Sequence, residues 1–326
     1  MKPETVSERE RLWQELVAQG RAQGAVPAAE PVQAWYLGLM LGAAAWFAGL
    51  LLMLTTALVW NLSGSEAFLP LALFWGVPGL LLLRVQGLGV FPWQLGLALL
   101  IAGECAAVAA IGMAFEEAEP TLLASAILFA GVATVAPRPA ARVLNVVAAC
   151  AAWALFLRWS LLGEPWRWYR MEEARPALGE ALLIWLLCWG PMLAALLWIA
   201  RSEARWMATH WSPLLRAALI GLCVALAFAT PLADPLAGVF IRESDGSRDW
   251  LALWPLLSLF AAGLAAAVAF QQRMRALLAL CLAGMLVHVA HFYFALGVSL
   301  LAKSVWMLLM GAGLLGLAYW LREDRR

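Results

Sequence analysis

The sequence predicts an all-α protein, a polytopic transmembrane helix bundle of about ten spans behind a short amphipathic N-terminal helix. Two observations predict this class. Hydrophobic residues make up 64% of the chain and charged residues only 13%, and apolar runs recur from Trp35 to the C-terminus, each near the roughly twenty residues that cross a bilayer. We therefore expect three parts: a cytoplasmic amphipathic segment at 1–33, a ten-helix transmembrane domain at 34–321 and a basic cytoplasmic tail at 322–326.

The polar N-terminal segment contains one predicted helix. Ser7 and Glu10 fit a capping box, in which each side chain accepts a hydrogen bond from the backbone of the other. An apolar stripe follows, formed by Leu12, Trp13, Leu16 and Val17. A helix of about twelve residues is marginally stable alone, so we expect it to dock on the membrane face or on its own bundle. The first apolar run begins only after about thirty polar residues and is long enough to span a membrane. We therefore interpret it as a transmembrane span and not as a cleaved signal peptide.

Ten apolar segments follow, and the second, fourth and fifth are the shortest. They are predicted at 34–58, 67–83, 92–114, 120–136, 140–158, 177–200, 212–232, 250–270, 276–296 and 300–321.

The basic residues predict the orientation. With the N-terminus inside, fifteen of the 22 Lys and Arg residues fall in cytoplasmic segments, as the positive-inside rule requires. We expect a multi-pass protein with both termini cytoplasmic, the loops around Glu116 and Asp245 outside, and the lipid bilayer as its surroundings. The net charge of +1 does not indicate a nucleic-acid partner.

No cofactor, metal or catalytic residue is predicted. The five cysteines lie in apolar segments without Cys-x-x-Cys spacing, so they are interpreted as small buried hydrophobes. His288 and His291 are one turn apart, whereas a zinc protease motif needs the second histidine at i+4 and a Glu beside the first. Haem ligation is a weaker alternative, and hydrogen bonding between helices is favoured.

Two prolines near mid-membrane, Pro78 and Pro191, are candidate helix breaks. Proline removes a backbone donor, and discontinuous helices at this depth expose backbone groups to the substrates of carriers. The alternative, which we favour, is a simple kink filled by neighbouring helices.

The outside loop at 158–175 interleaves aromatic and basic side chains, with Trp166, Arg167, Trp168 and Arg170 at its centre. Such a segment could contact a lipid phosphate or an extracytoplasmic partner. An interfacial anchor whose arginines pair with nearby glutamates is equally favoured.

Glu104 and His288 each lie twelve residues beyond the predicted start of a span that runs outward. They therefore share a depth of about 18 Å along a helix that rises 1.5 Å per residue. A carboxylate at this depth is costly, so Glu104 should be protonated, face water or have a partner. His288 is the partner that we predict, and a separate polar cavity is the main alternative.

The pattern Tyr-x-x-Leu-x-x-Ser-Leu-Leu-x-Lys-Ser, from Tyr293 to Ser304, resembles the C-terminal signature of a bacterial membrane family known only as domain of unknown function forty-four zero one. The matching positions are Tyr293, Leu296, Leu300, Lys303 and Ser304. The resemblance implies an inner-membrane protein, commonly encoded near a related membrane protein and one with a periplasmic GDYXXLXY domain, and it assigns no catalytic residue.

Lys303 enters the first turn of the last span, where the helix dipole disfavours a cation, so we expect an acceptor beside it.

Three functions remain open. The first is a membrane subunit that binds or positions an extracytoplasmic partner, such as a periplasmic protein, through the 158–175 loop and the 232–249 loop. The second is a carrier or channel for a small solute or proton that uses Glu104, the two histidines and the prolines. The third and weakest is an enzyme acting on a lipid-linked substrate. The oligomeric state is not predicted.

Overall fold

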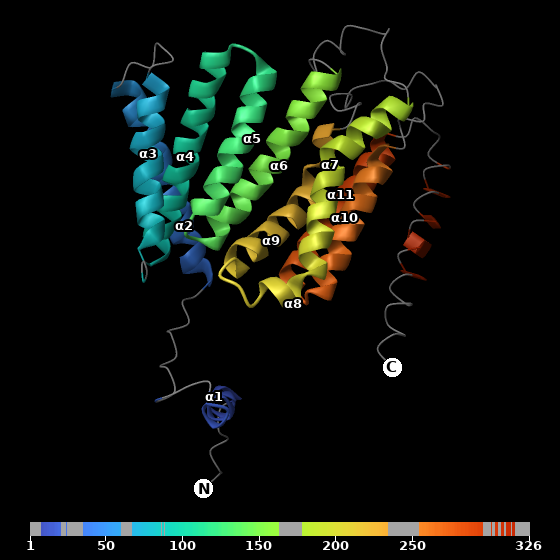
Figure 1. The fold of residues 1–326 in the computed structure, drawn as a ribbon, viewed down its shortest axis with the longest axis horizontal. Helices are drawn as coiled ribbons and strands as arrows, with labels where there is room; N and C mark the ends of the chain where they lie inside the picture. Colours follow the sequence, from blue (N-terminus) through green and yellow to red (C-terminus); the bar gives the residue numbers. More distant parts are fainter. Residues whose placement is uncertain are drawn as a thin grey trace.

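The computed structural model describes residues 8–20, 24, 35–59, 67–85, 87, 89–162, 178–233 and 254–295, together with scattered positions between 301 and 316. All regular structure in these ranges is helical, which confirms the all-α class (Figure 1).

Seven helices are long and apolar enough to cross a membrane. They are α2 (Trp35–Val59), α4 (Val90–Phe115), α5 (Ala118–Val135), α6 (Pro139–Leu162), α7 (Leu178–Arg201), α10 (Trp254–Gln271) and α11 (Arg275–Ala295). Two shorter apolar helices of 17 residues each, α3 (Phe68–Arg84) and α9 (Ser212–Phe228), pack among them. The remaining helices are α1 (Glu8–Ala18) and α8 (Glu203–Trp206), and a 3-10 turn, η3 (Thr230–Ala233), follows α9.

Each of the first nine predicted spans corresponds to one of these helices, whereas the tenth, at 300–321, lies largely outside the described residues. About ten spans are therefore not confirmed. The seventh span was predicted to run to residue 232, but α9 ends at Phe228. Pro231 explains the difference, because proline lacks a backbone N–H and disfavours helical geometry in the residue before it.

The prediction of discontinuous helices at Pro78 and Pro191 is wrong. Both α3 and α7 run without interruption through their prolines, Pro78 and Pro191. Close packing of α3 on α4 accounts for this at Pro78, because a Cβ atom on Gly79 would lie only 2.5 Å from the backbone nitrogen of Leu100. Near Pro191 the indole of Trp189 is fully buried. Both prolines are themselves exposed, so α3 and α7 continue as helices with the proline rings on the outer surface of the bundle, and the space beside them is not filled by neighbouring helices.

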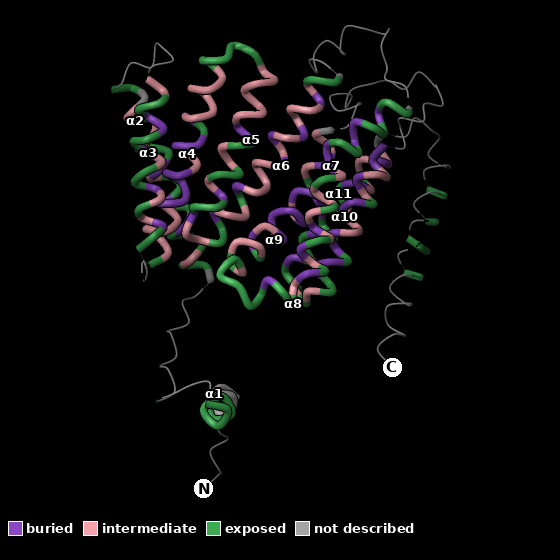
Figure 2. Tube along the Cα trace, viewed as in Figure 1, coloured by how far each residue is buried: buried purple, intermediate pink, exposed green. Residues whose placement is uncertain are grey.

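The helices form two groups that meet at the α5–α6 hairpin. In the first group α2 and α3 both pack against α4, and in the second α7, α9, α10 and α11 surround a common core to which α6 also contributes. Figure 2 shows the buried residues on the facing sides of these helices. The α5–α6 hairpin lies between the groups, because α5 packs on α4 of the first group and α6 packs on α9 of the second.

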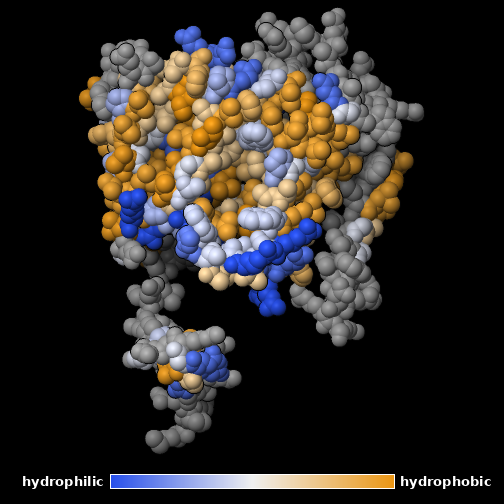
Figure 3. Space-filling model, viewed as in Figure 1, coloured by the Kyte–Doolittle hydropathy of each residue, from blue (hydrophilic) through white to orange (hydrophobic). Residues whose placement is uncertain are grey.

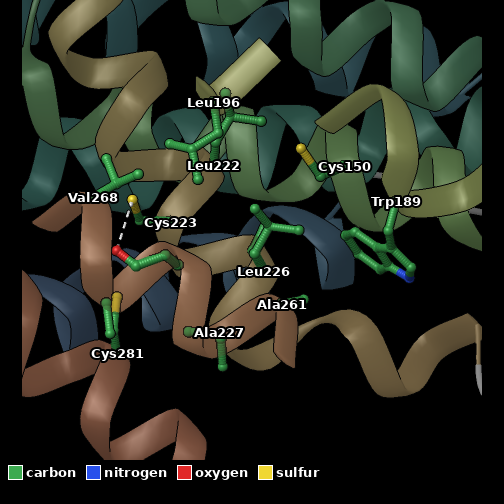
Figure 4. Packing of buried hydrophobic residues seen from close by; sticks show 14 of the residues in the cluster. Cys150, Trp189, Leu196, Leu222, Cys223, Leu226, Ala227, Ala261, Val268 and Cys281 are labelled. Carbon is green, nitrogen blue, oxygen red and sulfur yellow. Dashed lines mark hydrogen bonds between the residues drawn. The ribbon is translucent and has the colours of Figure 1, made fainter. Parts of the chain in front are cut away.

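The core of the second group is shown in Figure 4, where Leu196 from α7, Leu222 and Leu226 from α9, and Val268 from α10 converge. Small residues let these helices approach closely. A Cβ atom on Gly284 of α11 would lie 2.5 Å from the carbonyl oxygen of Ala227 on α9. Such contacts are the usual means by which membrane helices associate.

Polar and apolar surfaces are segregated along the bundle. Figure 3 shows a broad hydrophobic band across the helices, with hydrophilic side chains gathered at the lower edge near α8 and again at the upper edge. The α5–α6 turn and α8 lie at the lower end, and the α4–α5 turn lies at the upper end (Figure 1). The band is the surface expected of a multi-pass membrane protein.

The N-terminal helix α1 stands apart from the bundle, beyond its lower end (Figure 1). Leu16 and Val17 on its apolar stripe are 40% and 43% exposed. Docking of α1 on the membrane face or on its own bundle stays a prediction.

Candidate functional site

A buried polar pair links the two helix groups. Glu104 of α4 is 8% exposed and Asn145 of α6 is 2% exposed, and the Nδ2 atom of Asn145 donates to Oε1 of Glu104 at 2.9 Å. The same Nδ2 donates to the carbonyl oxygen of Ala141 at 3.1 Å. Glu104 is the one buried carboxylate among the described residues.

The apolar packing around the pair explains why it forms. Leu97 and Leu100 precede Glu104 by seven and four residues on the same face of α4, and this face packs against Ala136 and Ala141 at the α5–α6 turn. Asn145 lies one turn beyond Ala141 on α6. The carboxyl of Glu104 is therefore directed at the α5–α6 hairpin, and the amide of Asn145 meets it there.

One hydrogen-bonding atom of the Asn145 amide has no partner. A primary amide has two N–H hydrogens, and both of them are used in the bonds to Glu104 and Ala141. The other end of the amide, Oδ1, is buried without a hydrogen-bond partner. A buried acceptor without a donor costs about 1 to 3 kcal/mol, so this oxygen calls for an explanation.

The predicted pairing of Glu104 with His288 is wrong. The Nε2 atom of His288, on α11, lies 2.9 Å from the carbonyl oxygen of Ala227 on α9, and its Nδ1 has no hydrogen-bond partner. Because a carbonyl only accepts, Nε2 is the nitrogen that donates in this contact. Glu104 and His288 belong to different helix groups, so an equal distance along their helices does not make them neighbours.

The other candidate polar residues near the C-terminus are described only in part. His291, which precedes the C-terminal signature, and Tyr293, which begins it, are half-buried on α11, and Ser304 is exposed. Lys303 lies outside the described residues, so the acceptor predicted for it stays a prediction.

A second link lies at the opposite end of the bundle from α8. Arg158, near the end of α6, is 5% exposed, and its Nη1 donates to the carbonyl oxygen of Leu232 in η3 at 3.2 Å. The segments 163–177 and 234–253, which follow these two elements, are outside the described residues, as are Trp166, Arg167, Trp168 and Arg170. The structure thus joins the stems from which the two predicted outer loops begin.

Among the described residues, no three His, Cys, Asp or Glu side chains come together as a metal site. The five cysteines are free, and four of them are buried as predicted, whereas Cys105 is exposed.

Asn145 and Arg158 are the two contact residues that the sequence interpretation undervalued. Asn145 carried a usable signal, because it is one of two asparagines in the whole chain and lies inside a predicted apolar span, 140–158. Polar residues in such a position are usually partnered within the bundle. Arg158 was treated as part of an exterior loop, although it lies inside α6 and bonds to η3.

Comparison with known proteins gives a family and no activity. No curated protein and no solved structure matches the chain. Residues 34–244 and 249–323 match the family described as Domain of unknown function (DUF4401), so the match covers nearly all of the apolar part of the sequence. The chain therefore belongs to the DUF4401 family of membrane proteins.

Proposed function

We propose that the chain is a ten-span bacterial inner-membrane protein, with both termini in the cytoplasm, that binds or positions an extracytoplasmic partner. The observation that carries this proposal is the bond from Arg158 to the carbonyl of Leu232. It brings together the starts of the two loops that carry the outward aromatic and basic residues, so the loops can form one surface. A periplasmic protein is the partner that the family resemblance suggests.

The distribution of basic residues supports the orientation. Arg138, Arg201, Arg205 and Arg273 all lie at turns on the α8 end of the bundle, whereas the α4–α5 turn at the other end begins with Glu116 and Glu117. Under the positive-inside rule the α8 end is cytoplasmic. The Arg158–Leu232 bond then lies near the outer face.

Photo-crosslinking in living cells tests the partner role. A photoreactive amino acid at Trp168 should give one discrete protein adduct, and the same group at Leu81, which is 55% exposed on the apolar face of α3, should give only lipid adducts. Arg158→Gln, which weakens the stem, should reduce the adduct from Trp168. Lipid adducts alone from Trp168, or an adduct with a cytoplasmic protein, would overturn the proposal.

A carrier or channel for a proton or small solute is the second candidate, and the buried Glu104–Asn145 pair favours it. An ionisable group held within the membrane commonly marks a proton or solute pathway. In reconstituted liposomes an imposed pH gradient should drive flux through the wild type but not through Glu104→Gln. Equal flux through both proteins would remove this candidate. The lipid-directed enzyme has no specific support among the described residues.

A further inference from the structure

The unpartnered Oδ1 atom of Asn145 indicates what the buried Glu104–Asn145 pair can bind. We propose that Glu104 carries a proton on Oε2 and donates it to Oδ1 of Asn145, so that the pair is an intramembrane proton-binding site. The partner role does not depend on this site. The second candidate function does need such a site, and the proposal names its ligand as a proton.

The hydrogen bonds of the amide determine which atom needs a donor. The two N–H hydrogens of Asn145 are directed at Oε1 of Glu104 and at the carbonyl of Ala141, at 2.9 and 3.1 Å. A flipped amide would place an oxygen against both of these acceptors, so the orientation is fixed by its partners. Oδ1 is then an acceptor buried beside a carboxyl group, with no donor among the described residues.

Only one protonation state of Glu104 supplies that donor. An ionised carboxylate has acceptors alone, whereas a carboxylic acid has one O–H. With Oε1 occupied by the Asn145 N–H, the proton belongs on Oε2. An amide and a carboxylic acid are complementary, because one N–H···O bond and one O–H···O bond close a ring between them.

The charged groups on the neighbouring helices do not favour the ionised form. Arg142 precedes Asn145 by three residues on α6, but its Nε donates to the carbonyl of Ala136 at 2.6 Å. Arg84 lies in the last turn of α3 and Glu119 in the first turn of α5, so both are at helix ends. The described part of α2 holds no charged residue. Next to Glu104 on α4, Cys105 is exposed.

Protonation would change how firmly the two helix groups are joined. The proton adds a second hydrogen bond between α4 and α6, beside the one from Asn145 to Glu104. Its loss leaves a carboxylate oxygen facing Oδ1, and these two acceptors repel each other. Uptake and release of one proton would thus tighten and loosen the contact between the groups.

Infrared spectroscopy of the full chain in lipid nanodiscs tests the proposal directly. At neutral pH the wild type should show a carboxylic-acid C=O band that shifts in D2O and is lost in Glu104→Gln. Glu117→Gln is the matched control, because it removes an exposed carboxyl at the N-cap of α5, and it should keep the band. In Asn145→Leu the band should move to higher frequency, since the O–H loses its acceptor.

Glu104→Gln is expected to fold, because a glutamine carbonyl accepts from Nδ2 and its N–H donates to Oδ1. Absence of a band difference between the wild type and Glu104→Gln at neutral pH would overturn the proposal. So would carboxylate bands that respond to Na⁺ and not to pH, which would identify a cation site. If the carboxylic-acid band is present but no proton flux occurs in liposomes, only the carrier function is contradicted. If proton flux occurs without the band, only this proton-binding site is contradicted.

Discussion

Asn145 is the residue whose side chain joins the two helix groups most directly, since its amide contacts Glu104 on one side and its own helix on the other. Leucine at this position keeps the number and branching of the side-chain heavy atoms but removes both hydrogen bonds. Glu104 then becomes a buried carboxyl without a donor, and the cost of such a group exceeds the value of an average hydrogen bond.

We therefore predict that Asn145→Leu destabilises the protein by about 1 to 3 kcal/mol. Glu104→Gln, which keeps both hydrogen-bonding directions, should change stability much less. Thermal unfolding in one detergent, followed by circular dichroism, measures both variants. An Asn145→Leu protein as stable as the wild type would show that the buried pair contributes nothing.

Linkage gives a pH dependence at the same residue. If the folded chain keeps a proton on Glu104 that the unfolded chain releases, rising pH favours the unfolded state. The melting temperature of the wild type should fall toward alkaline pH more steeply than that of Glu104→Gln. Parallel curves for the two proteins would contradict a bound proton.

Glu104 and His288 should act independently. Each has its own partner in a different helix group, Asn145 and the carbonyl of Ala227. Losses of stability at separate sites usually add within about 0.3 to 0.5 kcal/mol. The double variant Glu104→Gln with His288→Gln should thus show the sum of the single losses, and a markedly smaller loss would restore the direct pair.

The sequence was informative about which of these residues are buried but not about their partners. The depth of Glu104 and His288 follows from the constant rise of a helix, which needs no knowledge of the fold. A partner depends on which helices touch, and apolar spans of similar composition contain little information about their neighbours. The sequence interpretation did not single out Asn145, because the apolar residues around it resemble those of the other predicted spans.

At the scale of helices, composition predicted the elements well and their packing poorly. Nine spans were expected in the described part, and helices occur at all of them. The errors lie at helix ends and at prolines. Pro231 ends α9 early, whereas Pro78 and Pro191 are accommodated inside helices. Pro78 and Pro191 are exposed on helices that continue through them, and a single sequence does not show whether a proline will interrupt a helix or lie within it.

The α3–α4 contact gives a prediction at this scale. A Cβ atom on Gly103 would lie 2.5 Å from the backbone nitrogen of Gly76 and 2.8 Å from the carbonyl oxygen of Ala72. Backbone atoms cannot move aside as a flexible side chain can, so Gly103→Ala must push the helices apart. We expect a loss of about 1 to 3 kcal/mol or more.

Gly131→Ala is the matched control, because nothing lies within 4 Å of the Cβ atom that it would add to α5. Alanine also has a higher helix propensity than glycine. Unfolding should show Gly103→Ala to be less stable than the wild type and Gly131→Ala to be at least as stable. Equal stability of the two variants would contradict the close approach of α3 and α4.

At the scale of the whole molecule, the two helix groups and the hydrophobic band describe a multi-pass membrane protein (Figure 3), and its orientation in the membrane is our proposal. Both functional proposals depend on that orientation. The partner surface must lie outside, and a proton path through Glu104 must have known ends. The direction of insertion is therefore the central claim.

Cysteine labelling of intact cells tests it most directly. In a background without the five native cysteines, single cysteines replace Glu117, exposed at the α4–α5 turn, and Ala208, exposed between α8 and α9. A membrane-impermeant maleimide should label position 117 in intact cells and position 208 only after the membrane is permeabilised. Labelling of position 208 but not 117 in intact cells would contradict the orientation and the partner surface that depends on it.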